Sequence, residues 1–145
     1  MSVDVEVVRE VTDEVVAAFA GLLPQLSSSA GGLDAAAVAR VVDAEANTVL
    51  TARLGGAVVG VLTLVVFPLP SGVRARIEDV VVDGSARGHG VGAALTAEAV
   101  RLAEAAGART VDLTSRPSRE AANRLYERAG FRPRESTVYR FTTSM

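Results

Sequence analysis

The residues with the clearest chemical potential lie in a glycine-rich turn, Arg87 to Ala93, which reads R-G-H-G-V-G-A. A helix that begins there presents unpaired backbone N–H groups, and glycines let a bulky anion approach the backbone closely. The guanidinium of Arg87 adds a fork that fits phosphate oxygens. The turn therefore predicts a phosphate-binding site, although a tight turn without any ligand could have the same composition.

The elements on either side of the turn would position it. Ile77–Val82 is strongly β-prone, and its three consecutive valines favour a strand that is buried on both faces. About four turns of helix are expected after the turn, with apolar residues at helical spacing: Val91, Leu95, Ala99, Leu102 and Ala106. The unit is thus predicted to be a strand, a glycine turn and a helix.

The spacing of the glycines separates the common phosphate-binding motifs. A Walker loop would end in Gly-Lys-Ser/Thr, which the chain lacks. A dinucleotide fingerprint would be filled only in its looser form, by Gly88, Gly90 and Ala93, with Asp112 as the ribose acid.

The first part of the chain predicts one strand and two helices. Val3–Val8 alternates as a half-buried strand does, Thr12 can cap a helix that Pro24 ends, and Asp34 can cap a second helix. Ser27–Gly32 is expected to be a flexible linker. The linker would suit either a segment that closes over a substrate or an ordinary surface connection.

Two further β-prone runs precede the glycine turn. Thr48–Leu54 and Ala57–Phe67 flank Gly55-Gly56, a two-residue hairpin signal, and Pro68–Gly72 is expected to turn the chain into the next strand. After the helix, Gly107 is a stop signal and Arg109–Thr114 predicts a fifth strand, parallel to the fourth. Ser118 is expected to cap a last helix.

Two motifs resemble those of the GNAT superfamily of N-acetyltransferases. Arg87, Gly90 and Gly92 fill R/Q-x-x-G-x-G/A, which resembles the acyl-CoA pyrophosphate loop of that superfamily. About thirty-five residues later, the pattern A-x-x-L-Y-x-x-x-G-F is filled by Ala122, Leu125, Tyr126, Gly130 and Phe131. Many members carry an asparagine where this chain has Arg119, and Asn123 is the candidate to replace it.

The resemblance spans the whole chain and implies a single N-acetyltransferase domain over residues 1–145. The implied fold is α+β, with a mixed, mostly antiparallel central sheet flanked by helices and a splayed parallel strand pair that forms the CoA cleft. Val138–Phe141 would supply the closing strand. The implied acetyl-CoA contacts are Val80, Val81, Val82, Arg87, Gly88, His89, Gly90, Val91, Gly92, Ala93, Asn123 and Tyr126.

Proton transfer has three candidates. Tyr126 is expected to be the general acid for the leaving thiolate, because a phenol with a reference pKa of about 10 is protonated at neutral pH. Glu78 and Asp79 are the candidate bases, and they point to opposite faces unless a bulge intervenes. Glu78 is preferred because it would share a side with Val80 and Val82. The alternative is that Glu78 and Asp79 are surface or ion-paired acids without a catalytic role.

The bulk composition narrows the class of protein. The chain has no cysteine, one histidine and a net charge of −2, so neither a metal site nor nucleic-acid binding is expected. No signal-peptide pattern and no membrane-spanning run is present, which predicts a cytoplasmic protein. A cluster of arginines could attract CoA's 3′-phosphate or an acidic substrate, or form a solvated helix face: Arg116, Arg119, Arg124 and Arg128.

The leading hypothesis is an enzyme that moves an acetyl group from acetyl-CoA to a primary amine by direct attack in a ternary complex, without a metal. A catalytically idle acyl-CoA-binding regulator and a small dinucleotide-binding domain are the alternatives. The sequence leaves open the amine acceptor and the oligomeric state, although homodimers are common in the superfamily.

Overall fold

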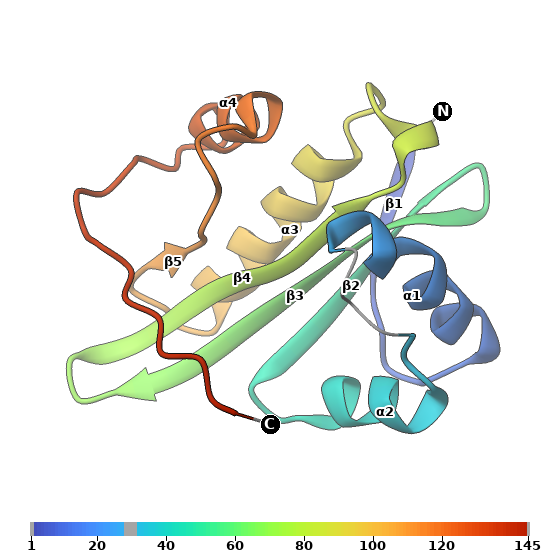
Figure 1. The fold of residues 1–145 in the computed structure, drawn as a ribbon, viewed down its shortest axis with the longest axis horizontal. Coiled ribbons are helices and arrows are strands. Elements are labelled where there is room, and N and C mark those ends of the chain that lie inside the picture. The colour runs from blue at the N-terminus through green and yellow to red at the C-terminus, as the bar shows by residue number, and fades with distance from the viewer. Residues whose placement is uncertain (1, 28–31, 145) are drawn as a thin grey trace.

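The computed structural model describes residues 2–27 and 32–144, which form a five-stranded sheet covered by helices (Figure 1). The strands lie side by side in chain order, with antiparallel pairing from β1 to β4 and a parallel pair between β4 and β5. They are β1 (Val3–Val7), β2 (Asn47–Leu54), β3 (Ala57–Leu69), β4 (Gly72–Val82) and β5 (Val111–Asp112). The expected α+β fold with a mixed, mostly antiparallel sheet is confirmed.

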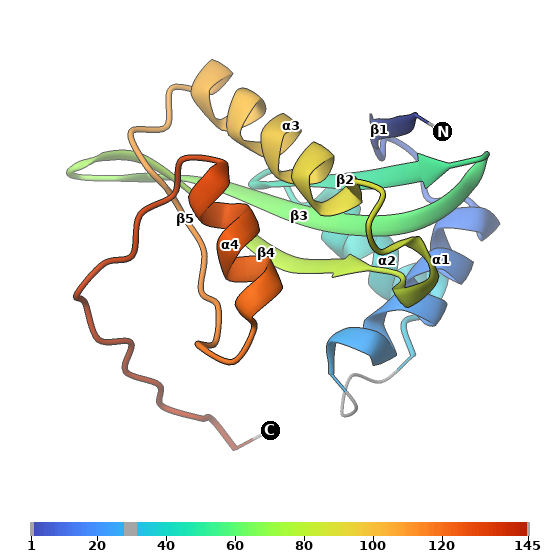
Figure 2. The same cartoon turned by 90° about the horizontal axis from the view of Figure 1, so that it is seen from above.

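The helices cover both faces of this sheet (Figure 2). Two of them, α1 (Asp13–Leu26) and α2 (Ala35–Asp43), pack on one face, and α3 (Val91–Ala105) packs on the other. A short 3₁₀ turn, η1 (Gly84–Ala86), precedes α3, and α4 (Glu120–Arg128) follows β5. No helix in the described part of the chain is long and apolar enough to cross a membrane.

Two hydrophobic cores form because successive side chains of a strand point to opposite faces. Leu50 and Leu62 lie in the core under α3, whereas Val49 and Val61 lie in the core under α1 and α2. Gly60 lets α3 approach β3 closely, since a Cβ at that position would lie 2.9 Å from the Cγ1 atom of Val91. The start of α3 is therefore fixed against the middle of the sheet.

The predicted caps and the first hairpin agree with the structure. The Thr12 hydroxyl accepts from the Val15 N–H at 3.2 Å, and the Asp34 carboxylate accepts from the Ala37 N–H at 2.8 Å. In the hairpin between β2 and β3, Gly55 and Gly56 both have positive φ angles, 61° and 86°, as the predicted two-residue turn requires.

Two expected boundaries in the first half of the chain were wrong. α1 continues past Pro24 to Leu26. A proline in the last turn removes only one helical hydrogen bond, and the Ser27 N–H still donates to the Leu23 carbonyl at 3.1 Å. β3 likewise runs through Pro68 to Leu69, so the turn into β4 is shorter than expected.

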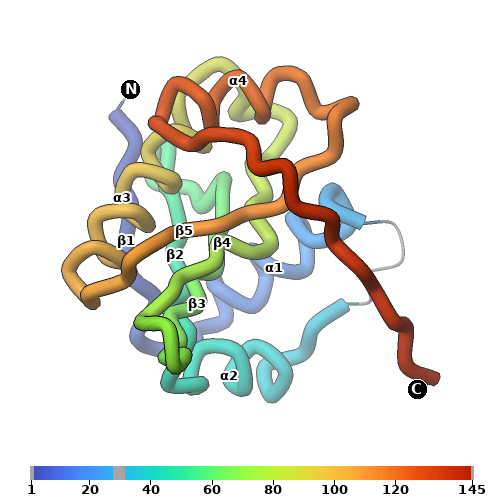
Figure 3. The backbone as a smooth tube through the Cα atoms, turned by 90° about the vertical axis from the view of Figure 1, so that its left-hand side faces the viewer, coloured from blue at the N-terminus to red at the C-terminus, as the bar shows by residue number. Residues whose placement is uncertain are grey.

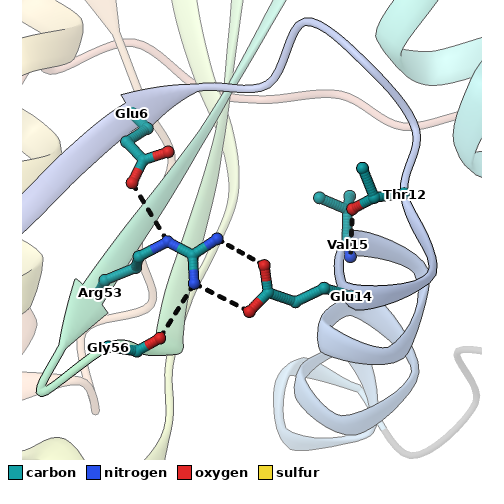
Figure 4. A network of polar contacts seen from close by, with 6 residues as sticks. All are labelled: Glu6, Thr12, Glu14, Val15, Arg53 and Gly56. Carbon is teal, nitrogen blue, oxygen red and sulfur yellow. Dashed lines mark hydrogen bonds and ion pairs between the residues drawn. The ribbon is translucent and has the colours of Figure 1, made fainter.

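A polar network ties β1, β2 and α1 together at Arg53 (Figure 4). The Arg53 guanidinium donates to Glu6 at 3.1 Å, to Glu14 at 2.8 Å and to the Gly56 carbonyl at 3.0 Å. The hydrogen bond from Arg53 lowers the pKa of the Glu14 carboxyl below its ordinary value. The network lies far from the glycine turn in sequence and has a structural role.

The last third of the chain departs most from expectation. β5 contains only Val111 and Asp112, where a strand over Arg109–Thr114 was predicted. Ser118 does not cap α4; Arg119 is at the cap position and makes no side-chain cap bond. Residues 131–144 form no regular structure, so the expected strand at Val138–Phe141 is absent from the described chain.

The C-terminal segment crosses the strands in Figure 1, but Figures 2 and 3 show that it runs clear of the sheet. Its aromatic side chains are accordingly exposed, Tyr139 at 91% and Phe141 at 90%. Most of the predicted Ser27–Gly32 linker, residues 28–31, lies outside the described residues.

Candidate functional site

The glycine turn between β4 and α3 has an open backbone. Gly88 and Gly90 adopt φ angles of 83° and 76°, a left-handed conformation that strains residues with a Cβ. A Cβ built on either glycine would meet no atom of the described chain within 4 Å. The space in front of the turn is therefore free for a ligand.

The first turn of α3 supplies hydrogen-bond donors to this space. Gly90 is the N-cap, and the Ala94 N–H is the first to donate within the helix, to the Gly90 carbonyl at 3.0 Å. The N–H groups of Val91, Gly92 and Ala93 have no acceptor inside the helix. Together with the helix dipole they favour an anion.

A cavity of about 860 Å³ opens beside the turn. Its walls come from β4, the glycine turn, α3 and α4. They comprise Val80, Val82, Ala86, Arg87, Gly88, Gly90, Val91, Gly92, Ala93, Thr96, Ser118, Arg119, Glu120, Ala121, Ala122, Arg124, Leu125, Tyr126 and Arg128. Four arginines and a single glutamate give these walls a positive potential, which suits a ligand with several phosphates.

The edge of β4 that faces β5 borders the cavity, because β5 pairs with only a short part of β4. β5 pairs with β4 only at Ala75 and Arg76. The Asp83 N–H donates to the Val59 carbonyl at 2.7 Å, so the backbone groups of Asp83 point toward β3. Backbone groups of successive strand residues point to opposite sides, so those of Val82 point toward the open edge of β4. Here the sheet is splayed, as the resemblance implied.

Tyr126 projects into the cavity from α4. Its ring lies edge-to-face against Phe131, with centroids 6.0 Å apart. Burial raises the pKa of the Tyr126 phenol above its ordinary value, and the nearby Arg119 guanidinium opposes this rise. The hydroxyl is therefore protonated at neutral pH and can donate a proton.

α4 reaches the cavity through a close contact with α3. A Cβ at Gly92 would lie 3.1 Å from the Cδ1 atom of Leu125. Gly92 therefore has a packing role besides its place in the turn. Gly92 and Leu125 belong to the two motifs found in the sequence. The motifs predict that both residues are present but not that they contact each other.

The two candidate bases do not line this cavity. Thr63 pairs with Glu78 and Val61 pairs with Val81, so Asp79 and Val80 together oppose one residue of β3. This is a β-bulge, and Asp79 has a φ angle of 49°, the only positive value among the described non-glycine residues.

The bulge corrects the predicted direction of Glu78. Beyond it the alternation is shifted, so Glu78 faces the side of α1 and α2 while Val80 and Val82 face the cavity. Glu78 instead lies 3.8 Å from the Arg76 guanidinium. Asp79 borders a second, smaller pocket under α1 and α2.

Three further predicted contacts are not brought to the cavity. Val81 is 5% exposed and packs in the core under α1 and α2. His89 is exposed and is not among the cavity walls. Asn123 is also not among the cavity walls, and its amide donates to the Arg116 carbonyl at 3.0 Å.

Residues that the sequence argument did not place at the site include Thr96, whose hydroxyl donates to the Gly92 carbonyl at 2.7 Å. Of the arginine cluster that the sequence offered for CoA's 3′-phosphate, Arg119, Arg124 and Arg128 line the cavity and Arg116 does not. Among the described residues, no group of three or more His, Cys, Asp or Glu side chains could hold a metal ion.

Comparison with known proteins identifies the family. The sequence profile described as the acetyltransferase (GNAT) family matches residues 25–131, which includes β2 to α4 and both motifs. The chain belongs to the GNAT acetyltransferase family. No curated protein matches the sequence significantly.

Several solved structures share the fold over nearly the whole chain. An acetyltransferase from Trypanosoma brucei is 26% identical, with a TM-score of 0.79, and the match covers 97% of this chain and 100% of that one. A transcriptional regulator from Bacillus halodurans is 24% identical, with a TM-score of 0.83 and coverage of 97% and 100%. AAC(6')-Iy, solved with the bisubstrate analogue CoA-S-monomethyl-acetylneamine, is 19% identical, with a TM-score of 0.78 and coverage of 99% and 100%.

Proposed function

We propose that this GNAT protein transfers an acetyl group from acetyl-CoA to a primary amine within a ternary complex. The observation that carries the proposal is the convergence of three features on one cavity: an open glycine turn, an unpaired edge of β4, and a protonated tyrosine. Each answers one requirement of the reaction, namely donor binding, carbonyl orientation and proton delivery.

The cavity suits CoA in charge and in shape. The N–H groups of Val91, Gly92 and Ala93 would hold the pyrophosphate, and Gly88 and Gly90 leave room for it. The arginines of α4 would pair with the remaining phosphate charge. AAC(6')-Iy, a protein of the same fold, was solved with a CoA-based analogue, which supports CoA as the ligand of this cavity.

The chemistry needs two proton movements. The amine nitrogen forms a bond to the thioester carbonyl carbon, the carbon–sulfur bond breaks, and the amine loses one proton. A backbone N–H on the open edge of β4 at Val80 or Val82 would polarise the carbonyl. Tyr126 would give its phenolic proton to the departing sulfur and be reprotonated from solvent.

Glu78 and Asp79 are the proposed routes for the proton that leaves the amine. Both side chains are on the α1 and α2 side of the bulge, next to Val80, which lines the cavity. Because neither lines the CoA cavity itself, the proton would leave on the far side of the bulge, either directly to a carboxylate or through an intervening water.

The same observation favours one other function. A regulator that binds acyl-CoA without turnover needs the cavity but no base, and Glu78 is already close to Arg76. Replacing Tyr126 by Phe separates the two functions, since only an enzyme would lose turnover.

Calorimetry with acetyl-CoA, followed by a thiol-release assay over a broad amine panel, tests the proposal. We expect binding of acetyl-CoA and amine-dependent release of CoA thiol. Absence of binding would refute the function altogether, whereas binding without release for every amine would favour the regulator.

A further inference from the structure

A second, smaller pocket lies on the opposite face of β4 from the CoA cavity. It has a volume of about 50 Å³. Its walls are Phe19 and Leu23 from α1 and Val38 and Val41 from α2, and its mouth carries the carboxylate-bearing residue Asp79. The pocket is thus apolar, with one anionic group.

The position of Asp79 links the two pockets. Asp79 and Val80 are consecutive residues of the bulge, yet Asp79 borders the small pocket and Val80 borders the CoA cavity. β5 does not cover this stretch of β4. An amine held at Asp79 would therefore lie beside the strand edge along which the acyl group is proposed to lie.

We propose that the small pocket is the acceptor subsite and that it selects a primary amine carrying a short, uncharged aliphatic arm. The inference rests on the proposed acetyl transfer and adds the class of the acceptor. The arm enters between α1 and α2, and Asp79 accepts a hydrogen bond from the amino group. A polyhydroxylated or multiply charged amine would leave polar groups unpaired against these walls.

Size and polarity both support this assignment. A volume of about 50 Å³ gives room for roughly four water-sized groups. Among the described residues, Thr63 is the only wall residue besides Asp79 with a polar side chain. Phe19 and Val38 are 6% and 1% exposed, so core packing holds these two walls in place.

Apolar walls also favour the reactive form of the acceptor. Desolvation disfavours an ammonium relative to a neutral amine, and only the neutral amine has the lone pair that attacks. The Asp79 carboxylate acts in the opposite sense, because an anion stabilises the ammonium, but it can also accept the proton that the amine loses. The apolar walls would thus choose the acceptor, and Asp79 would hold and deprotonate it.

The first test compares two primary amines with the same number of non-hydrogen atoms. 2-Methylbutylamine and 3-aminopropane-1,2-diol differ only in that two hydroxyls of the diol replace carbons of the alkyl arm. With acetyl-CoA saturating, we expect kcat/KM for the free-base alkylamine to be higher by about 10- to 100-fold. Equal values, or a preference for the diol, would overturn the subsite.

The second test uses a matched pair of valines in α2. Both are half-buried, but only Val41 borders the pocket. Val41→Thr should lower kcat/KM for 2-methylbutylamine about tenfold, while Val42→Thr should change it less than twofold. Asp79→Asn should raise KM for the amine about tenfold or more without changing acetyl-CoA affinity. Equal effects of the two valine variants would refute the assignment.

Direct binding separates failure of the subsite from failure of the proposed function. The two amines are titrated by calorimetry into protein saturated with CoA. Preferential binding of the alkylamine without turnover would uphold the subsite and refute acetyl transfer. Turnover with a preference for hydroxylated amines would uphold acetyl transfer and refute the subsite. Absence of both acetyl-CoA and amine binding would refute both proposals.

Discussion

Residues 2–27 and 32–106 of this GNAT protein differ sharply from residues 107–144 in how they are packed. α3 has five buried residues, among them Leu95 and Ala99 at 0% exposure, whereas α4 has none. β4 has eleven residues and β5 has two. The glycine turn belongs to the well-packed part, and Tyr126 belongs to the other.

The difference indicates how the site is assembled. The CoA cavity lies between the two regions, and α4 meets α3 where Leu125 approaches Gly92. A ligand that touches both walls would add contacts that the protein lacks on its own. Acetyl-CoA is therefore expected to stabilise the last third of the chain more than the sheet.

The largest expected effect is on the free energy of unfolding. Leu95→Ala removes a fully buried side chain under the sheet and should lower this free energy by about 2–5 kcal/mol. Leu125→Ala, at a half-buried position, should lower it by less than half as much. Urea titrations of both variants measure the difference, and equal losses would contradict the proposed contrast in packing.

Tyr126→Phe should have the next largest effect. Loss of the general acid should lower kcat about 10²-fold while acetyl-CoA affinity stays within about twofold. Because burial raises the Tyr126 pKa, the native enzyme should keep its activity through neutral pH and lose it only above that raised value. The Phe variant should lack this alkaline loss, which pH–rate profiles would reveal.

Gly92→Ala should affect binding more than folding. The added Cβ would lie 3.1 Å from the Leu125 side chain and push α4 outward. We expect acetyl-CoA affinity to fall about three- to tenfold. Gly21→Ala is the control, since a Cβ there meets no atom within 4 Å. Unchanged affinity in Gly92→Ala would show that α4 is not positioned through this contact.

Hydrogen exchange would sharpen the comparison directly. Saturating acetyl-CoA should increase protection of backbone amides in α4 about tenfold or more, while amides of β2 and β3 change little. Uniform protection across both regions would mean that the cavity walls are equally rigid before binding.

The smallest expected effect concerns Arg53. Arg53→Met should lower the midpoint of thermal unfolding and leave acetyl-CoA affinity unchanged, because its partners are Glu6, Glu14 and Gly56. The Glu14 pKa is lowered in the folded state, so this contribution exists above the ordinary carboxyl pKa and is lost as the pH falls through the lowered value. Melting curves at neutral and acidic pH provide the check.

Local patterns predicted the first region well. Thr12, Asp34 and Gly55-Gly56 act through neighbours a few residues away, so their sequence context contains the whole interaction. The glycine turn was found for the same reason. Its glycines both permit the positive φ angles of the turn and mark the residue at which α3 begins.

The bulge, which the sequence left open, and the C-terminal segment, which was predicted wrongly, both depend on distant partners. The apolar alternation along β4 does not show where β3 has one residue fewer than β4, and the direction of Glu78 depends on that position. Val138–Phe141 is β-prone, yet a strand also requires a neighbouring edge, which no local pattern supplies.

The left-handed backbone at Asp79 limits which amino acids can occupy that position. Asn and Gly tolerate such a conformation, whereas β-branched residues do not. A saturation library at this codon should therefore retain folded protein mainly for Asp, Asn and Gly. Substitutions that change the acceptor are therefore expected in α1 and α2, whose side chains can vary without removing the bulge in β4.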